Sequence, residues 1–376
     1  MRQRTAVPWR GRVALVAGLV GAVTMVAASS VPAGAAPPTL PAPSSNGITL
    51  VSWSQVTGSE GSGVPRLIDA TMTTGAIYRN DSHPQIKVRI LLPANYQTNP
   101  ATPYPVLYLL HGGAGGFADW SDSGSGNIKN IVAGSPFRGI VVMPEGGRAG
   151  WYSNWRGATD GGFSPQWEDF HIRQLVPWID ANFNVIHDRS GRAIAGLSMG
   201  GLGSLEYAGR FTGTFSKVGA FSAGTDLTET GAQQIVADSM WQVGASIGWT
   251  GFFDGNYRVT GSTQLRMETV FGPAGANGRW DTQNPYQMAA NYNAYDTRFG
   301  LYSGQNSSST EGERQIGQWN TRFHTQLNAA SVAHRFCTGT GTHSWGYWRA
   351  DLADFLQYAY GTTPGTCPNN WGAPTP

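Results

Sequence analysis

Residues 196–200 read Gly-Leu-Ser-Met-Gly and lie between an apolar run and a segment with helical spacing. The apolar run covers residues 192–195, and apolar side chains recur at helical spacing over residues 202–208. A G-x-S-x-G sequence in this order is typical of a sharp strand-to-helix turn that exposes its serine at the end of a strand. The pattern therefore predicts an α/β fold with Ser198 at the edge of the sheet.

A second G-x-S-x-G match occurs at residues 244–248, with Ser246 at its centre. The preceding residues 238–243 contain no β-branched run and have more helix than strand character. Because the chain contains 51 glycines in 376 residues, chance matches of this pattern are expected. We interpret Ser246 as such a match.

Apolar runs typical of strands alternate with helical stretches along most of the chain. Residues 86–92 alternate like a half-buried strand, whereas residues 106–110 and 140–143 are continuously apolar, as in central parallel strands. Strand-like runs follow at 194–196, 218–221 and 299–302, and helical stretches at 167–183 and 315–330. This alternation predicts a mostly parallel sheet with helices on both faces, which binds ligands at the carboxyl ends of its strands.

Residues 225–297 form a long excursion between two of these strands and are rich in aromatic side chains. We expect most of the aromatics to form a satellite core, and the remainder to line a lid or cleft beside Ser198. They are Trp241, Trp249, Phe252, Phe253, Tyr257, Trp280, Tyr286, Tyr292 and Tyr295.

The first 35 residues have the pattern of a secretory signal peptide. Arginines precede an apolar run at 13–31, and the small residues 33–35 form a cleavage site. The run is long enough to span a bilayer, so a retained anchor is the alternative, but the cleavage site favours a secreted or cell-wall associated protein without a stable membrane span. We expect a flexible lead-in at 36–45 and a single domain at 46–376.

The charge composition argues against a nucleic-acid partner, and the cysteine count argues against a metal site. The formal net charge is +2 with 13% charged residues, which provides no basic stripe for nucleic acid. Cys337 and Cys367 are the two cysteines, and in an exported protein an even pair predicts one disulfide rather than a metal site. We expect neither a metal nor another cofactor, and a monomer is the default expectation.

A nucleophilic serine needs an imidazole to accept its proton and a carboxylate to orient the imidazole. Three histidines follow Ser198 in the chain. His324 lies inside a predicted helix and His334 in a strand-like run, whereas His343 occupies a strand-to-helix loop where it can reach Ser198. The carboxylate is not fixed by periodicity, because residues 301–306 carry none; Glu311, Glu313 and Asp296 stay open.

Backbone N–H groups that could stabilise an oxyanion are expected at two places. Met199 follows the serine, and Gly113 lies in the glycine-rich loop that follows residues 106–110. This loop is similar to the HGGG-type turn that supplies a second donor in esterases. His111 begins the loop at a strand end, and we expect it to contact substrate.

Several motifs resemble the secreted mycolyltransferases of the antigen 85 complex, within the esterase D-like branch of the α/β-hydrolases. The likeness runs from about residue 86 to residue 358. The motifs are Val142-Met143-Pro144-Glu145-Gly146-Gly147, Trp151-Tyr152-Ser153-Asn154-Trp155, Gly196-Leu197-Ser198-Met199, Phe271-Gly272-Pro273 with Asn284-Pro285, and Gly341-Thr342-His343-Ser344-Trp345-Gly346-Tyr347-Trp348. The resemblance implies an α/β-hydrolase fold with the aromatic-rich excursion beside its active site.

The resemblance also implies roles for single residues. It prefers Glu313 as the acid, by counting back without a gap from the matched Phe323, and it assigns the oxyanion donors to Gly113 and Met199. Trp345 matches a family residue close to the active-site loop and is a candidate for substrate binding. Family members transfer a mycoloyl group between trehalose lipids through an acyl-serine.

Two departures from the family pattern concern the acceptor. The family has Asp-Gly-Leu-Arg where this chain has residues 111–114, so an arginine used for the sugar acceptor is missing, and Gly346 replaces a glutamate. We therefore expect a secreted serine esterase or acyltransferase acting on an acyl ester, with a glycolipid or sugar as a candidate acceptor. The alternative is a non-catalytic cell-wall or matrix-binding protein on the same scaffold.

Overall fold

The structure is a computed structural model. It describes residues 44–56, 66–77, 85–93, 96, 101–159, 162–245, 259, 261–273, 278–295, 298–305, 312–362 and 366–368, which belong to one compact unit, Pro37–Pro376. The predicted signal peptide, Ser246, Asp296 and Glu311 lie outside the described residues. So does most of the expected lead-in, although Ser44 and Ser45 form a short strand.

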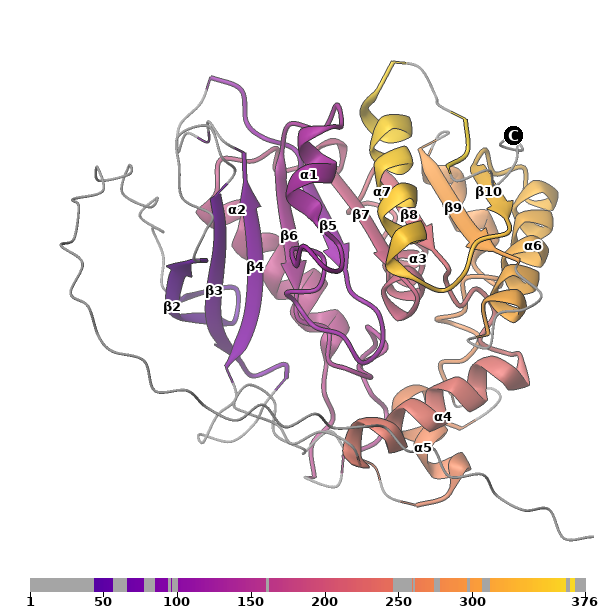
Figure 1. The fold of residues 1–376 in the computed structure, drawn as a ribbon. Coiled ribbons are helices and arrows are strands. Elements are labelled where there is room, and N and C mark those ends of the chain that lie inside the picture. The colour runs from indigo at the N-terminus through magenta and orange to yellow at the C-terminus, as the bar shows by residue number, and fades with distance from the viewer. Residues whose placement is uncertain are drawn as a thin grey trace, which may run out of the picture. The chain divides into compact units, whose positions relative to one another are not determined.

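The described strands pair into one ten-stranded sheet in the order β1-β2-β3-β4-β6-β5-β7-β8-β9-β10 (Figure 1). Pairs from β1 to β4, and the β4–β6 pair, are antiparallel, and all other pairs are parallel. The strands are β1 (Ser44–Ser45), β2 (Ile48–Gln55), β3 (Arg66–Thr74), β4 (Ile86–Leu92), β5 (Val106–Leu110), β6 (Ile140–Pro144), β7 (Arg192–Leu197), β8 (Lys217–Phe221), β9 (Phe299–Gly304) and β10 (Arg335–Gly339).

Helices cover both faces of this sheet. Side chains from α2, α3 and α6 pack in the core on one face, and side chains from α1 and α7 pack on the other, nearer the viewer in Figure 1. The helices are α1 (Ile128–Ala133), α2 (Val176–Asn182), α3 (Met199–Arg210), α4 (Thr230–Ala245), α5 (Thr263–Phe271), α6 (Glu313–Ala329) and α7 (Trp345–Tyr360). This arrangement confirms the α/β-hydrolase fold.

The predicted strands agree with the structure, but the first three strands were not predicted. The β2 strand is half exposed, with polar side chains on both faces, so it lacks the clean alternation that marks a strand in sequence. The predicted helix at 167–183 divides into a π-helical segment, Asp169–Leu175, followed by α2. The strand-like run at 332–336 begins later, at Arg335, and continues to Gly339.

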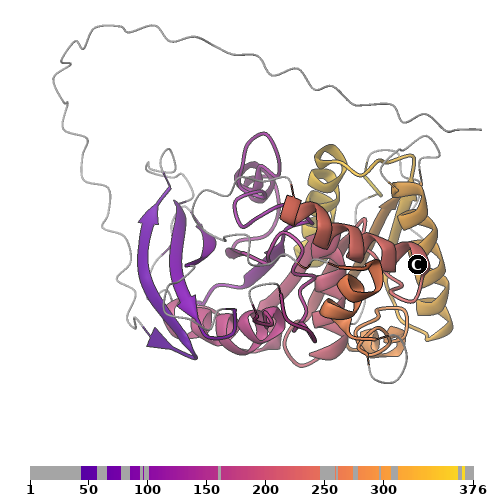
Figure 2. The same ribbon diagram turned by 90° about the horizontal axis from the view of Figure 1, so that it is seen from below.

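The excursion at 225–297 brings α4 and α5 beyond the carboxyl ends of the central strands, as the views from the side and from below show (Figures 1 and 2). Of its aromatics, Trp280, Tyr292 and Tyr295 are buried and Tyr286 packs against them, but these residues join the large core of the sheet and do not form the separate satellite core that we expected. Trp249, Phe252, Phe253 and Tyr257 lie outside the described residues. In the described part of the chain, none of the helices combines the length and the apolar character needed to cross a membrane.

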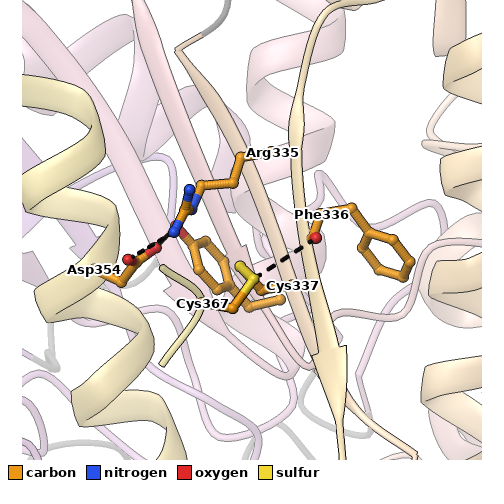
Figure 3. The surroundings of a disulfide bond; sticks show 6 residues. Arg335, Phe336, Cys337, Asp354 and Cys367 are labelled. Atoms are coloured by element: carbon orange, nitrogen blue, oxygen red, sulfur yellow. Dashed lines mark hydrogen bonds and ion pairs between the residues drawn. A yellow bond between two sulfur atoms is a disulfide. The ribbon is translucent and has the colours of Figure 1, made fainter. Parts of the chain in front are cut away.

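The predicted disulfide joins Cys337 on β10 to Cys367 near the carboxyl terminus (Figure 3). Both cysteines are buried. Beside it, Arg335 Nε lies 2.8 Å from Asp354 Oδ2 of α7, and the Cys367 sulfur lies 3.9 Å from the carbonyl oxygen of Phe336. The bond therefore ties the terminal segment to the last strand, on the face covered by α7.

Replacing both cysteines by alanine is expected to lower the free energy of unfolding by about 3–4 kcal/mol. The bridge closes a loop with a sequence separation of 30 residues, and its loss frees the unfolded chain to explore more conformations. Urea unfolding of the oxidised protein and the double variant measures the difference. A change below about 1 kcal/mol would contradict the prediction; the dithiothreitol-treated wild type serves as the matched control.

Candidate active site

Ser198 sits on a strained turn between β7 and α3. Its backbone has φ 53° and ψ −119°, which a non-glycine residue rarely adopts. The flanking glycines are required by close approach: a Cβ at Gly196 would lie 2.3 Å from the oxygen of Gly200, and a Cβ at Gly200 would lie 2.4 Å from the oxygen of His111. These contacts explain why the turn needs glycine on both sides of the serine.

The structure brings Ser198, His343 and Glu313 into one series of hydrogen bonds. His343 Nε2 lies 3.0 Å from Ser198 Oγ, and His343 Nδ1 lies 2.6 Å from Glu313 Oε2. The three side chains come from the turn after β7, the loop between β10 and α7, and the first residue of α6. With Nδ1–H donating to the carboxylate, Nε2 is free to accept the serine proton.

Glu313 is fully buried and is held from its other oxygen as well. Its Oε1 accepts hydrogen bonds from Ser222 Oγ at 2.9 Å and from the Gly304 N–H at 2.7 Å. Trp348 Nε1 donates to Ser222 Oγ at 3.1 Å, and its ring packs edge-on against His343 at 4.8 Å between centroids. These contacts fix the carboxylate and the imidazole relative to each other.

Ser222, Gly304 and Trp348 were not singled out in the sequence as parts of the site. Ser222 directly follows the predicted strand at 218–221, so its place at a carboxyl strand end was the available signal. Its backbone φ is 48°, a second strained residue beside the serine turn. Trp348 ends the motif at 341–348 that resembles the mycolyltransferases, but nothing in that motif indicated its contact with Ser222.

Two backbone N–H groups lie beside Ser198. Met199 is the first residue of α3, so its N–H has no acceptor within the helix. A Cβ built at Gly113 would lie 4.0 Å from the Cβ of Met199, which places the two residues side by side. Within the described residues, the Gly113 N–H makes no backbone hydrogen bond. The two residues predicted to supply oxyanion donors are therefore neighbours at the serine turn.

His111 is buried below this loop, with 1% of its surface exposed. Its Nδ1 lies 2.8 Å from the oxygen of Gly112, and its Nε2 accepts a hydrogen bond from the Gly146 N–H at 2.9 Å. Tyr152 Oη donates to the His111 carbonyl at 2.9 Å. Both ring nitrogens are therefore used within the protein, and the structure does not bring the His111 ring to the serine.

Trp345 follows His343 by two residues and is partly buried. Its ring packs edge-on against Trp120 and Trp348, at 5.2 and 5.3 Å between centroids. It therefore lies next to the His343 loop, where the family resemblance placed it. Because Trp348 also packs against His343, this packing stabilises the loop that carries His343.

An apolar pocket of about 50 Å³ opens beside Ser198. The excursion contributes Leu227 and, from α4, Ala232 and Ile235, while α6 contributes Ile316 and Trp319. The other lining residues are Trp151, Met199, Leu202, Ser222 and Gly224. The pocket walls are hydrophobic and the reactive hydroxyl is at one side, as in a site for an acyl chain. Among the described residues, no cluster of three or more histidine, cysteine or acidic side chains could hold a metal ion.

A further histidine, His171, is buried next to the segment that follows β6. His171, in the π-helical segment, is 4% exposed, and its Nε2 lies 2.8 Å from the oxygen of Glu145 while its Nδ1 lies 2.8 Å from Tyr207 Oη. Glu145 in turn accepts hydrogen bonds from the N–H groups of Gly147 and Phe117. Burial lowers the pKa of His171 to about 4, so the imidazole is neutral in the folded protein.

This neutral histidine predicts acid sensitivity. Because the folded-state pKa lies below the ordinary value of 6.5, the unfolded chain binds more protons between these two values. Stability therefore rises with pH across this window and is lost as pH falls from about 6.5 to 4, by up to about 3 kcal/mol. Burial lowers the pKa of His324 and His334 too, and these add in the same direction.

Urea unfolding of His171→Gln across the same window isolates this contribution. Glutamine can donate to Glu145 and accept from Tyr207 without titrating, so we expect a shallower pH slope than in the wild type. The exposed His187, replaced in the same way, is the matched control and should keep the wild-type slope. Equal slopes in both variants would rule out His171 as the source.

The comparisons with known proteins agree with this geometry. Residues 81–359 match the model of the Esterase family. The chain belongs to this family. Relatives with curated descriptions include the esterase Rv1288 of Mycobacterium tuberculosis, 33% identical over 74% of this chain and 56% of that protein. Another is the diacylglycerol acyltransferase/mycolyltransferase Ag85A of Mycobacterium bovis, 26% identical over 87% of this chain and 97% of that protein.

This member of the Esterase family spans a little over half the length of the first relative, 56%. Solved structures with the same fold include a ferulic acid esterase, with a TM-score of 0.55 and 21% identity over 79% of this chain and 97% of that one. Mycobacterium tuberculosis MPT51 has a TM-score of 0.55 and 24% identity over 74% of this chain and 93% of that one. The family match and the curated relatives confirm the resemblance to the mycolyltransferases.

Proposed function

We propose that this chain is a secreted serine esterase or acyltransferase that cleaves carboxylic esters through an acyl-serine on Ser198. The observation that carries the proposal is the unbroken series of hydrogen bonds from Ser198 Oγ through the His343 imidazole to the buried carboxylate of Glu313. Such a series converts a weakly nucleophilic hydroxyl into a reactive one. Secretion rests on the amino-terminal signal pattern.

In the first step, Ser198 Oγ attacks the ester carbonyl carbon and His343 Nε2 takes the hydroxyl proton. The N–H groups of Gly113 and Met199 stabilise the negative oxygen of the tetrahedral intermediate. Glu313 stabilises the imidazolium that forms. His343 then gives its proton to the leaving alkoxide, the ester C–O bond breaks, and the acyl group stays on Ser198.

In the second step, a hydroxyl compound attacks the acyl-serine. His343 removes its proton, the tetrahedral intermediate forms again, and Ser198 leaves with the proton returned by the imidazole. Water as the attacking group gives hydrolysis, and a sugar hydroxyl gives acyl transfer. The missing arginine in the loop at 111–114 favours water, because a charged hydrogen-bond donor for the sugar is absent from that loop.

Acyl release from p-nitrophenyl butyrate by the mature protein and its Ser198→Ala variant tests the proposal, with trehalose and glucose added in turn. We expect the wild type alone to release p-nitrophenol, with free butyrate as the main product. An acyl-sugar product would select transfer over hydrolysis. Equal inactivity of both proteins on all esters would favour a non-catalytic binding protein on the same scaffold.

A further inference from the structure

Part of the wall of the pocket beside Ser198 is a small hydrophobic cluster of its own. Ala232 of α4 packs with Ile316 and Trp319 of α6, separate from the two large cores of the sheet. Trp319 is 2% exposed and Ile316 is 8% exposed, and all three residues line the pocket. The seam between α4 and α6 is therefore closed by these side chains.

The position of Trp319 is fixed by the same helix that carries the triad acid. Trp319 comes six residues after Glu313, so it lies about 9 Å further along the axis of α6. Asn320, its neighbour, donates to the oxygen of Ala223 at 2.8 Å. Because Glu313 and Asn320 both bind the segment after β8, α6 is held at two points, and the indole of Trp319 is held in the wall of the pocket.

The α4 side of the seam is close-packed as well. A Cβ built at Gly231 would lie 2.3 Å from Gln315 Nε2, so the side chain of Gln315 on α6 reaches the first turn of α4. Across the same seam, Arg322 Nη2 lies 2.5 Å from Glu229 Oε1 in an exposed ion pair. The helices leave no open channel at these contacts.

The size of the pocket sets the length of the chain that it can hold. A pocket of about 50 Å³ can hold more than one water molecule, but it is small beside the roughly 300–1,000 Å³ of pockets that take drug-sized ligands. Its apolar lining suits methyl and methylene groups. Longer chains would meet the indole of Trp319.

We propose that Trp319 sets the acyl-chain length, so that Ser198 acts on esters of short carboxylic acids. This inference rests on the proposed function. Shortening Trp319 opens the pocket along the seam between α4 and α6, where additional methylenes can be buried. Each methylene buried there improves the reaction of a longer chain by a factor of up to about four.

The test compares kcat/KM for p-nitrophenyl butyrate and p-nitrophenyl octanoate. In the wild type we expect butyrate to be preferred by at least about tenfold, since four methylenes find no apolar contact. In Trp319→Ala we expect the octanoate-to-butyrate ratio to rise by about 10- to 100-fold. Trp319→Phe should give an intermediate ratio, and it serves as the test if the alanine variant does not fold.

The matched control is Trp280→Ala. Trp280 is also buried, at 4% exposure, but it packs on Phe271 at 4.7 Å between centroids and does not line the pocket. Its loss should lower stability and leave the ratio unchanged. A ratio that is unchanged at Trp319, that shifts equally in the control, or that already favours octanoate in the wild type overturns the inference. If the wild type shows no turnover that depends on Ser198, the proposed function itself is overturned.

Discussion

Replacing His343 with alanine is expected to lower kcat for p-nitrophenyl butyrate by about 10⁴- to 10⁶-fold. The Ser198 hydroxyl lies 3.0 Å from His343 Nε2, and no other imidazole contacts it in the described structure. Without this base the serine keeps its proton, and the leaving alkoxide has no proton donor. The oxyanion donors and the pocket remain, so a small rate above that of water should persist.

Steady-state kinetics at neutral pH check this expectation, with circular dichroism to confirm folding. His187→Ala is the matched control, because its imidazole is exposed and should leave kcat within about threefold. A decrease of less than tenfold in His343→Ala would exclude this histidine as the general base. Such a result would also weaken the assignment of Ser198, because the nucleophile would then lack its partner.

Replacing Glu313 with glutamine is expected to lower kcat by about 10³- to 10⁴-fold. The carboxylate accepts from three donors: the His343 imidazole, the Ser222 hydroxyl and the Gly304 N–H. Glutamine offers one acceptor oxygen and one NH₂ group. If the NH₂ group faces His343, Nδ1 must accept its hydrogen bond, and the imidazole takes the tautomer with the hydrogen on Nε2. Nε2 then cannot accept the serine proton.

The other orientation of the amide sets its NH₂ against the Gly304 N–H, two donors in a buried place without water, which is unfavourable. The NH₂ group is therefore expected to face His343, which holds the imidazole in the tautomer that cannot accept the serine proton. Ser222→Ala is the matched control: it removes one donor to the same carboxylate but leaves the imidazole contact, so kcat should fall by less than about tenfold. If Glu313→Gln and Ser222→Ala had equal, small effects, Glu313 would be a structural carboxylate and the acid would have to be sought elsewhere.

Some elements of the sheet could be predicted from the sequence and others could not. The runs at 106–110 and 140–143 are apolar without interruption, which in a chain of this length is typical of strands buried on both faces; they became β5 and β6 at the centre of the sheet. The half-exposed β2 strand was missed, because polar side chains lie on both of its faces. The helix at 167–183 was predicted, but the sequence did not indicate that its first part, Asp169–Leu175, is π-helical.

In the candidate site, too, some residues could be predicted from the sequence and others could not. Ser198 could be placed from sequence because the turn depends on neighbours within a few residues, and His343 because it stands in a loop between two periodic segments. The acid could not be chosen by periodicity, since Glu313, Glu311 and Asp296 are all compatible with a loop or a helix start. Only the family resemblance favoured Glu313.

The sequence by itself determined the α/β class, the strand-to-helix turn at Ser198 and the presence of an even cysteine pair, since each depends on local spacing or composition. The tertiary structure decided which carboxylate meets His343, that His111 turns inward, and that Trp319 lines the pocket beside Ser198. These outcomes depend on how elements far apart in the chain pack: β8 with α6 for the acid, the loops after β5 and β6 for His111, and α4 with α6 for Trp319. Contacts between elements far apart in the chain carry no periodic signal, so a single sequence does not reveal them.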